Sequence, residues 1–254
     1  MNHDAVPNSL RRLWRLPMPP SRLGRKSALD IDTVVSTAVR LADRGGLEAA
    51  TLPRVAEELG VTPMSLYRYV GSKQELLQLM VDAASQPPAT EADQLDWREG
   101  LRRWAFDLWE LSSRRPWIPR VPVYAAPSGP NQVAWLERAL AELADTDVEW
   151  GDKLIAIGLL SGYVRHSVLL TEDLREGRPV DEEQVESEYR YGLALRELID
   201  PDQFPNLAEM LGTDVFGPAD KSTDETARRD FATGLELVLD GLARRIERIA
   251  NTAE

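Results

Sequence analysis

Apolar residues recur every three to four positions along most of this chain, which is the period of an amphipathic helix. In the segment 28–44 they fall on one face, formed by Ile31, Val34, Val35, Ala38 and Leu41. The segment 96–113 repeats the pattern with Trp97, Leu101, Trp104, Leu108 and Leu111. No stretch alternates apolar and polar residues as a half-buried strand does. The pattern predicts an all-α fold.

Two of the later helices favour pairing between two copies of the chain. Helices are predicted over 131–143, 148–170, 181–198 and 224–250, with a short helix or turn over 201–211. The helix 148–170 is apolar nearly all round, and Gly158, Ser161 and Gly162 would let another backbone approach it closely. The last helix carries a long apolar stripe of Phe231, Leu235, Val238, Leu242, Ile246 and Ile249. Together they predict a four-helix bundle across a two-fold axis, the alternative being two ordinary core helices.

Two short helices separated by a glycine turn are predicted between residues 51 and 70. Thr51 is a suitable N-cap for the first helix, and Gly60 ends it where a left-handed backbone is wanted. Thr62 caps the second helix, with Pro63 at its first position, where the missing N–H costs nothing. This is the helix-turn-helix arrangement, although a helical hairpin with a solvated outer face has the same spacing.

The second of these helices is predicted to lie in a DNA groove. Turning Leu66 and Val70 inward leaves a short, mixed polar and aromatic face, which suits a major groove about 12 Å wide. Phosphates are within reach of Tyr67, Tyr69, Lys73 and the first N–H groups after Thr51 and Thr62. A third helix is predicted to follow, opened by a capping box of Ser72 and Glu75.

This part of the chain resembles the DNA-binding domain of TetR-family regulators. The resemblance covers about residues 30 to 82 and rests on Thr51-Leu-Pro-Arg-Val-Ala, Leu59-Gly60-Val61, Ser65-Leu66-Tyr67-Arg68-Tyr69-Val70, and Lys73 with Glu75-Leu76-Leu77. It implies that the recognition positions are Thr62, Pro63, Met64, Ser65, Arg68 and Tyr69, and that Tyr67 and Lys73 contact phosphates. Pro53 departs from the pattern, because some members place a polar base-contacting residue there.

The distribution of charge supports this interpretation although the net charge of −12 opposes it. Residues 1–73 carry 11 Lys and Arg against 7 Asp and Glu, a net charge of +4. Residues 74–254 carry 19 against 35, a net charge of −16. The basic end attracts phosphates, and the acidic body is repelled by DNA, which favours one docking orientation.

The chain is predicted to hold an arm and two domains. Residues 1–27 form a basic, disordered arm, in which Arg25 and Lys26 either contact DNA or belong to a plain tail. Residues 28–85 form a three-helix, helix-turn-helix DNA-binding domain. Residues 91–254 form a larger helical ligand-binding and dimerisation domain, after a hinge of Gln86-Pro87-Pro88-Ala89-Thr90.

Composition excludes several kinds of protein. The absence of cysteine rules out disulfides, a thiolate nucleophile and a cysteine-based zinc site. The N-terminus lacks the apolar core of a signal peptide, and the longest apolar run, 154–164, is about half a membrane span. We therefore expect a cytoplasmic protein that needs no membrane, metal or cofactor.

Aromatic residues in the first half of the larger domain indicate a small-molecule pocket. The candidate ligand-binding residues are Trp104, Phe106, Trp109, Trp117, Trp135, Tyr163 and His166. The alternative is that such aromatics pack against neighbouring helices, and that His166 is a satisfied core or interface histidine.

The sequence thus predicts a homodimeric regulator that binds double-stranded operator DNA. By analogy with the family, we expect a repressor released by a small hydrophobic or aromatic effector. A ligand-independent DNA-binding dimer is the alternative. An enzyme is disfavoured, because the chain has no glycine-rich phosphate loop, nucleophile elbow or metal-ligand spacing.

Overall fold

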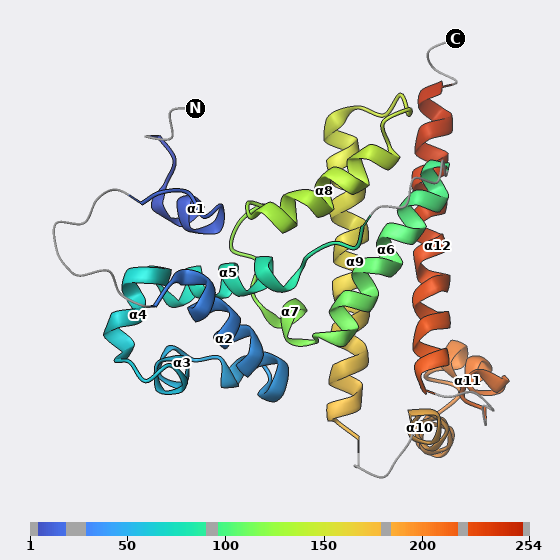
Figure 1. Ribbon diagram of the computed structural model, residues 1–254. Coiled ribbons are helices and arrows are strands. Elements are labelled where there is room, and N and C mark those ends of the chain that lie inside the picture. The colour runs from blue at the N-terminus through green and yellow to red at the C-terminus, as the bar shows by residue number, and fades with distance from the viewer. Residues whose placement is uncertain (1–4, 19–28, 90–95, 179–183, 218–222, 251–254) are drawn as a thin grey trace. The chain divides into compact units, whose positions relative to one another are not determined.

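The computed structural model describes residues 5–18, 29–89, 96–178, 184–217 and 223–250. Within these ranges every regular element is a helix, which confirms the all-α prediction (Figure 1). The chain separates into two compact units, the first holding residues 1–168 and 239–254 and the second holding residues 169–238. The domain limits inferred from the sequence stay predictions.

The helix-turn-helix region consists of α2 (Ile31–Gly45), α3 (Leu52–Glu58) and α4 (Pro63–Val70), followed by α5 (Lys73–Ala84). A short 3-10 turn, η1 (Leu47–Ala49), lies between α2 and α3. As predicted, Thr51 Oγ1 accepts a hydrogen bond from Arg54 N at 3.5 Å, and Gly60 has a φ of +64°. The helices close over a buried core that includes Val34, Val35, Ala38, Val55, Ala56, Leu66, Val70, Leu76 and Met80.

The caps predicted at the starts of α4 and α5 differ in part from those in the structure. Thr62 precedes α4, but its hydroxyl lies 2.9 Å from Ser65 Oγ and takes no backbone N–H. Ser72 Oγ accepts from Glu75 N at 3.0 Å, whereas the Glu75 carboxylate turns to Arg12 and leaves the capping box half formed. Arg12 Nε and Nη2 donate to Glu75 Oε2 at 2.8 and 2.5 Å, so the ion pair offers two hydrogen bonds where the backbone offers one.

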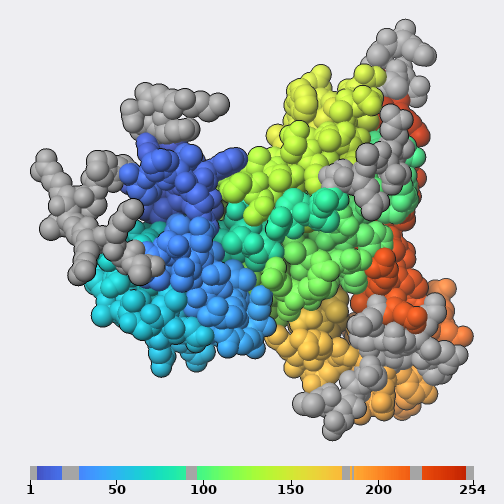
Figure 2. Space-filling model, in the orientation of Figure 1, coloured from blue at the N-terminus to red at the C-terminus, as the bar shows by residue number. Residues whose placement is uncertain are grey.

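Helix α1 (Asn8–Leu13) lies within the segment predicted to be a disordered arm, and that prediction is wrong for these residues. Leu13 is only 4% exposed and belongs to the same core as α5. Trp14 Nε1 donates to Ser128 O at 2.8 Å, so the segment also contacts the loop before α8. In Figure 2 the dark-blue surface of α1 lies against its neighbours. Local composition predicts disorder here, because the stabilising contacts come from residues distant in the sequence.

The remainder of the first unit is built from α6 (Trp97–Arg114), α7 (Trp117–Arg120), α8 (Pro130–Glu142), most of α9 (Trp150–Glu176) and the last part of α12 (Thr223–Ala250). Asp96 caps α6 by accepting from Glu99 N at 2.9 Å. The α6 stripe is buried at Leu101 and Trp104, while Trp97 and Leu108 are partly buried. Between α6 and α8 the proline-rich segment 115–129 is irregular apart from α7, because proline has no backbone N–H to donate within a helix.

The second unit contains α10 (Gln184–Leu198), α11 (Pro205–Leu211), η2 (Asp214–Phe216) and the first part of α12 (Thr223–Ala250). Tyr191 and Phe216 meet edge to face, with ring centroids 5.5 Å apart. Phe231 and Leu235 of α12 are buried, in agreement with the predicted stripe. Residues 181–183, the start of the helix predicted over 181–198, lie outside the described residues.

Candidate functional site

The outer face of α4 carries most of the predicted base-reading residues. Leu66 and Val70 are both 0% exposed, so the predicted inward pair fixes α4 to the core. On the other side, Met64 is 76% and Tyr67 44% exposed. Thr62, Pro63 and Arg68 are also exposed, whereas Ser65 and Tyr69 are partly buried. The inward pair leaves this set on an accessible face of one short helix.

Basic side chains flank this face. The Arg68 guanidinium lies 5.8 Å from the Tyr69 ring centroid, and Lys73 is exposed at the start of α5. Thr51 is partly buried, and its hydroxyl already caps α3. Arg54, which sequence analysis did not select, is also exposed in the first turn of α3. Its signal in the sequence is a basic residue three positions after the N-cap. Arg25 and Lys26 lie outside the described residues.

Replacement of Arg68 by alanine is expected to weaken specific operator binding by roughly 1–3 kcal/mol, the usual value of one bidentate contact to a base. Competition between operator and unrelated DNA measures the effect. Arg44→Ala is the matched control, because Arg44 is an exposed arginine that lies 3.4 Å from Glu58 Oε1 and is therefore partly neutralised. An unchanged ratio of specific to non-specific affinity would remove Arg68 from the reading set.

Replacement of Lys73 by alanine is expected to weaken binding to all DNA sequences alike. A phosphate contact carries no sequence information, so the slope of log affinity against log salt should fall by about one. Titrations of operator and random DNA at several salt concentrations measure both effects. A loss seen with the operator alone would contradict the phosphate role.

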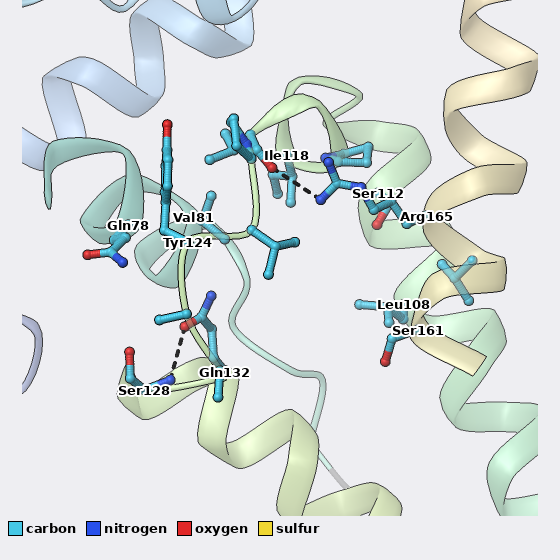
Figure 3. A pocket seen from close by; sticks show the side chains of 17 residues that line it. Gln78, Val81, Leu108, Ser112, Ile118, Tyr124, Ser128, Gln132, Ser161 and Arg165 are labelled. Atoms are coloured by element: carbon cyan, nitrogen blue, oxygen red, sulfur yellow. Dashed lines mark hydrogen bonds between the residues drawn. The ribbon is translucent and has the colours of Figure 1, made fainter. Parts of the chain in front are cut away.

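A cavity of about 210 Å³ lies in the first unit, beside the last turns of α5 (Figure 3). Its walls include Val81 of α5, Leu108 of α6, Tyr124 of the loop before α8, Gln132 of α8 and Arg165 of α9. Apolar side chains and prolines supply most of the remaining lining. Helical walls with a few inward polar groups are typical of a small-molecule site.

None of the seven aromatic and histidine residues predicted to bind ligand lines this cavity. Three of them are core residues whose indole N–H groups are satisfied. Trp104 Nε1 donates to Trp135 O at 2.9 Å, Trp135 Nε1 to Ser85 O at 2.7 Å, and Trp117 Nε1 to Asp43 Oδ1 at 2.7 Å. Phe106, Trp109 and Tyr163 are partly buried, and His166 is exposed. Their part in ligand binding stays a prediction.

Sequence analysis selected none of the residues that line the cavity for ligand binding, and the charged one among them is Arg165. It follows Ser161 by four positions, so both side chains fall on one side of α9. A polar pair at this spacing inside an otherwise apolar helix was the available signal in the sequence. Aromatic content was a poor guide, because tryptophan fills a helical core as readily as it lines a pocket.

Asp82 joins α5 to the start of α8, next to the cavity. Its Oδ1 accepts hydrogen bonds from the backbone N–H groups of Asn131 and Gln132, each at 3.0 Å. Asn131 Nδ2 in turn donates to Asp82 O at 2.9 Å. Asp82 is 5% exposed, and burial raises the pKa of its carboxyl group although the two N–H bonds oppose this. Gly129 leaves room for the contact, since a Cβ there would overlap the carboxylate.

One side of α9 is apolar and uncovered within the single chain. Leu154, Ile155 and Leu159 are 51%, 63% and 61% exposed. A Cβ added at Gly158 or Gly162 would meet no atom within 4 Å, so a second backbone can approach closely there. Among the described helices, α9 is also the one long and apolar enough to cross a membrane, by length and composition alone.

Comparison with known proteins connects these features. Residues 34–80 match the model for "Bacterial regulatory proteins, tetR family", and residues 87–246 match "Tetracyclin repressor-like, C-terminal domain". The HTH-type transcriptional repressor DrrR1 of Streptomyces coeruleorubidus is 34% identical over 243 residues, covering 93% of this chain and 85% of that protein.

Solved structures show the same fold. The protein ActR of Streptomyces coelicolor in complex with actinorhodin has a TM-score of 0.69 at 26% identity, covering 87% of this chain and 98% of that one. Apo ActR has a TM-score of 0.67, also at 26% identity, covering 85% and 97% of the two chains. The likeness therefore extends over both the helix-turn-helix and the larger helical region.

Proposed function

Because the chain belongs to the TetR family of DNA-binding transcriptional regulators, we propose that it is a homodimeric repressor released from its operator by a small molecule. The observation that carries the proposal is the accessible outer face of α4, held in place by the fully buried Leu66 and Val70. The name of DrrR1 as a repressor supports the sign of control.

In this proposal α4 enters the major groove of the operator. Met64 and Arg68 reach base edges, Tyr67 and Lys73 reach phosphates, and Arg54 adds a further positive charge beside them. A single short helix reads few bases, whereas two helices about 34–36 Å apart read two half-sites on one side of the duplex. Specific recognition therefore calls for a dimer.

The uncovered side of α9 provides the interface of the proposed dimer. Its exposed leucine and isoleucine side chains gain most by packing against a second copy, and its open glycines permit close approach. We prefer this role to a membrane span, because Arg165 and His166 lie within the same helix and the family consists of DNA-binding regulators.

The effector occupies the cavity beside α5. Gln132 lines the cavity, and its backbone N–H is bonded to Asp82 of α5. A ligand that shifts the start of α8 therefore acts directly on a helix of the DNA-binding region. Release requires only that the ligand bind the DNA-free arrangement more tightly than the DNA-bound one. The complex of ActR with actinorhodin supports a pocket for small molecules in this fold.

The alternatives are weaker. A ligand-independent dimer leaves the cavity without a role. For an enzyme, we find no group of three or more His, Cys, Asp or Glu residues able to hold a metal ion in the described ranges, and the matched relatives are regulators. We place the protein in the cytoplasm, where its operator would be.

The test is binding of the purified full-length chain to the intergenic DNA beside its own gene, at two salt concentrations and with unrelated DNA as competitor. We expect tight, selective and salt-dependent binding by a dimer. Binding no stronger than to the competitor at every candidate site would contradict the proposal.

A further inference from the structure

The cavity beside α5 has a single charged side chain. Its polar lining consists of Gln78, Ser112, Tyr124, Ser128, Gln132 and Ser161, together with the guanidinium of Arg165 (Figure 3). No aspartate or glutamate lines it, in a protein that carries 42 acidic residues against 30 basic ones. The one charged side chain in the lining is therefore a cation, although the chain as a whole is acidic.

Arg165 is only partly satisfied by the protein. Its Nη1 donates to Val121 O at 3.1 Å in a partly buried setting, and that carbonyl carries no net charge. In the described part of the chain its side-chain hydrogen-bond partner is this carbonyl and not a carboxylate. Partly buried arginines elsewhere in the first unit do have such partners, at 2.5 Å between Arg12 and Glu75 and at 2.8 Å between Arg138 and Asp107. A guanidinium has five N–H donors, so several remain available at Arg165.

The other source of positive potential nearby is already used. The first backbone N–H groups of α8, those of Asn131 and Gln132, both donate to the Asp82 carboxylate. An anion in the cavity would therefore be drawn to Arg165 and away from the end of the cavity next to Asp82. The lining thus combines one cationic side chain, Arg165, with apolar side chains such as Val81, Leu108 and Ile118.

We propose that the effector of this cavity is an anionic aromatic compound, with a carboxylate or sulfonate paired to Arg165 and an apolar ring system against the remaining lining. This rests on the proposed function, because it assigns a chemical class to the same effector. A planar fork of donors matches a two-oxygen anion, and such pairs are stronger than neutral hydrogen bonds. The ligand would supply the counter-charge that the chain does not.

Two fluorescent probes test this without DNA. Anilinonaphthalene sulfonate and N-phenylnaphthylamine share the same ring system. The first carries an anionic sulfonate group, and the second is neutral. We expect Arg165→Met to weaken binding of the sulfonate roughly tenfold or more and to leave the neutral probe unchanged. Arg165→Lys keeps a positive charge but not the planar pair of donors, so its affinity for the sulfonate should lie between those of the parent and Arg165→Met. Arg178→Met is the matched control, because Arg178 also donates to a backbone carbonyl, Leu174 O at 3.1 Å, and does not line the cavity.

Three outcomes would overturn the inference. The first is that the sulfonate does not bind the full-length protein. The second is that it binds Arg165→Met as tightly as the parent. The third is that Arg165→Met binds both probes more weakly. The last result would mean that Arg165 only holds the Val121 loop in place. Operator binding is measured separately. If the protein binds its operator but fails the probe test, the proposal of an anionic effector is contradicted and the proposal of a DNA-binding regulator still stands.

Discussion

Replacing Leu159 with glutamate is expected to convert the proposed dimer to monomers and to weaken operator binding more than 100-fold. Leu159 is 61% exposed in the single chain, between Gly158 and Gly162 on the open side of α9. In a two-fold dimer the new carboxylate would be buried in both copies. An unpaired buried charge costs about 3–5 kcal/mol, and every 1.4 kcal/mol is a factor of about ten.

Sedimentation equilibrium and light scattering measure the change in mass, and a fluorescence titration with operator DNA measures the change in affinity. Leu198→Glu is the control, because Leu198 is 79% exposed at the end of a different helix, α10. It should stay dimeric and bind DNA normally. A dimer that survives Leu159→Glu with full operator affinity would place the interface elsewhere.

Replacing Asp82 with alanine is the second change with a large expected effect. The substitution removes the acceptor for two N–H groups at the start of α8. Asp82 is only 5% exposed, so water cannot readily replace its carboxylate. Each buried donor left unsatisfied costs about 1–3 kcal/mol, so for two donors we expect a loss of roughly 2–6 kcal/mol in the free energy of unfolding. Urea denaturation followed by circular dichroism measures it.

Asp82→Asn is the informative partner, because the amide keeps an acceptor oxygen and carries no charge. Burial raises the pKa of Asp82 above 3.8, the ordinary value for aspartate. The folded protein therefore holds the proton to a higher pH than the unfolded chain does, and stability from this group is lost as the pH rises from about 3.8 through the folded pKa.

The stability of Asp82→Asn relative to the parent should accordingly increase with pH across that window and then stay constant. Parallel denaturation curves from acidic to neutral pH measure the difference. A relative stability that falls with rising pH would mean that the hydrogen bonds to the ionised carboxylate outweigh its burial.

The parts of this protein that could be predicted from sequence depend on short-range rules. Gly60 has the left-handed φ that its place after α3 requires, and Leu66 and Val70 are buried because residues four apart share a helix face. Such rules involve a few neighbouring residues, so a single sequence contains them. The helix-turn-helix was therefore predictable almost residue by residue.

The candidate pocket was less predictable because it depends on distant residues. Whether a tryptophan lines a cavity or fills a core is decided by its partners, and Trp135 is satisfied by Ser85, fifty positions earlier. Helix α1 was not predicted for the same reason, because its Arg12 pairs with Glu75, which is 63 positions away in the chain. What distinguishes Arg165 is likewise set by distant residues, because no aspartate or glutamate lines the cavity around it.

The close approach of Gly129 to Asp82 has a consequence for the evolution of the family. A β-carbon at position 129 would overlap the carboxylate, and without the carboxylate the first N–H groups of α8 would lose their acceptor. Neither position can change freely while the other is fixed. Among relatives that keep this joint, glycine at the one site and aspartate at the other should be inherited together and exchanged together, a covariation between residues 47 apart in the chain.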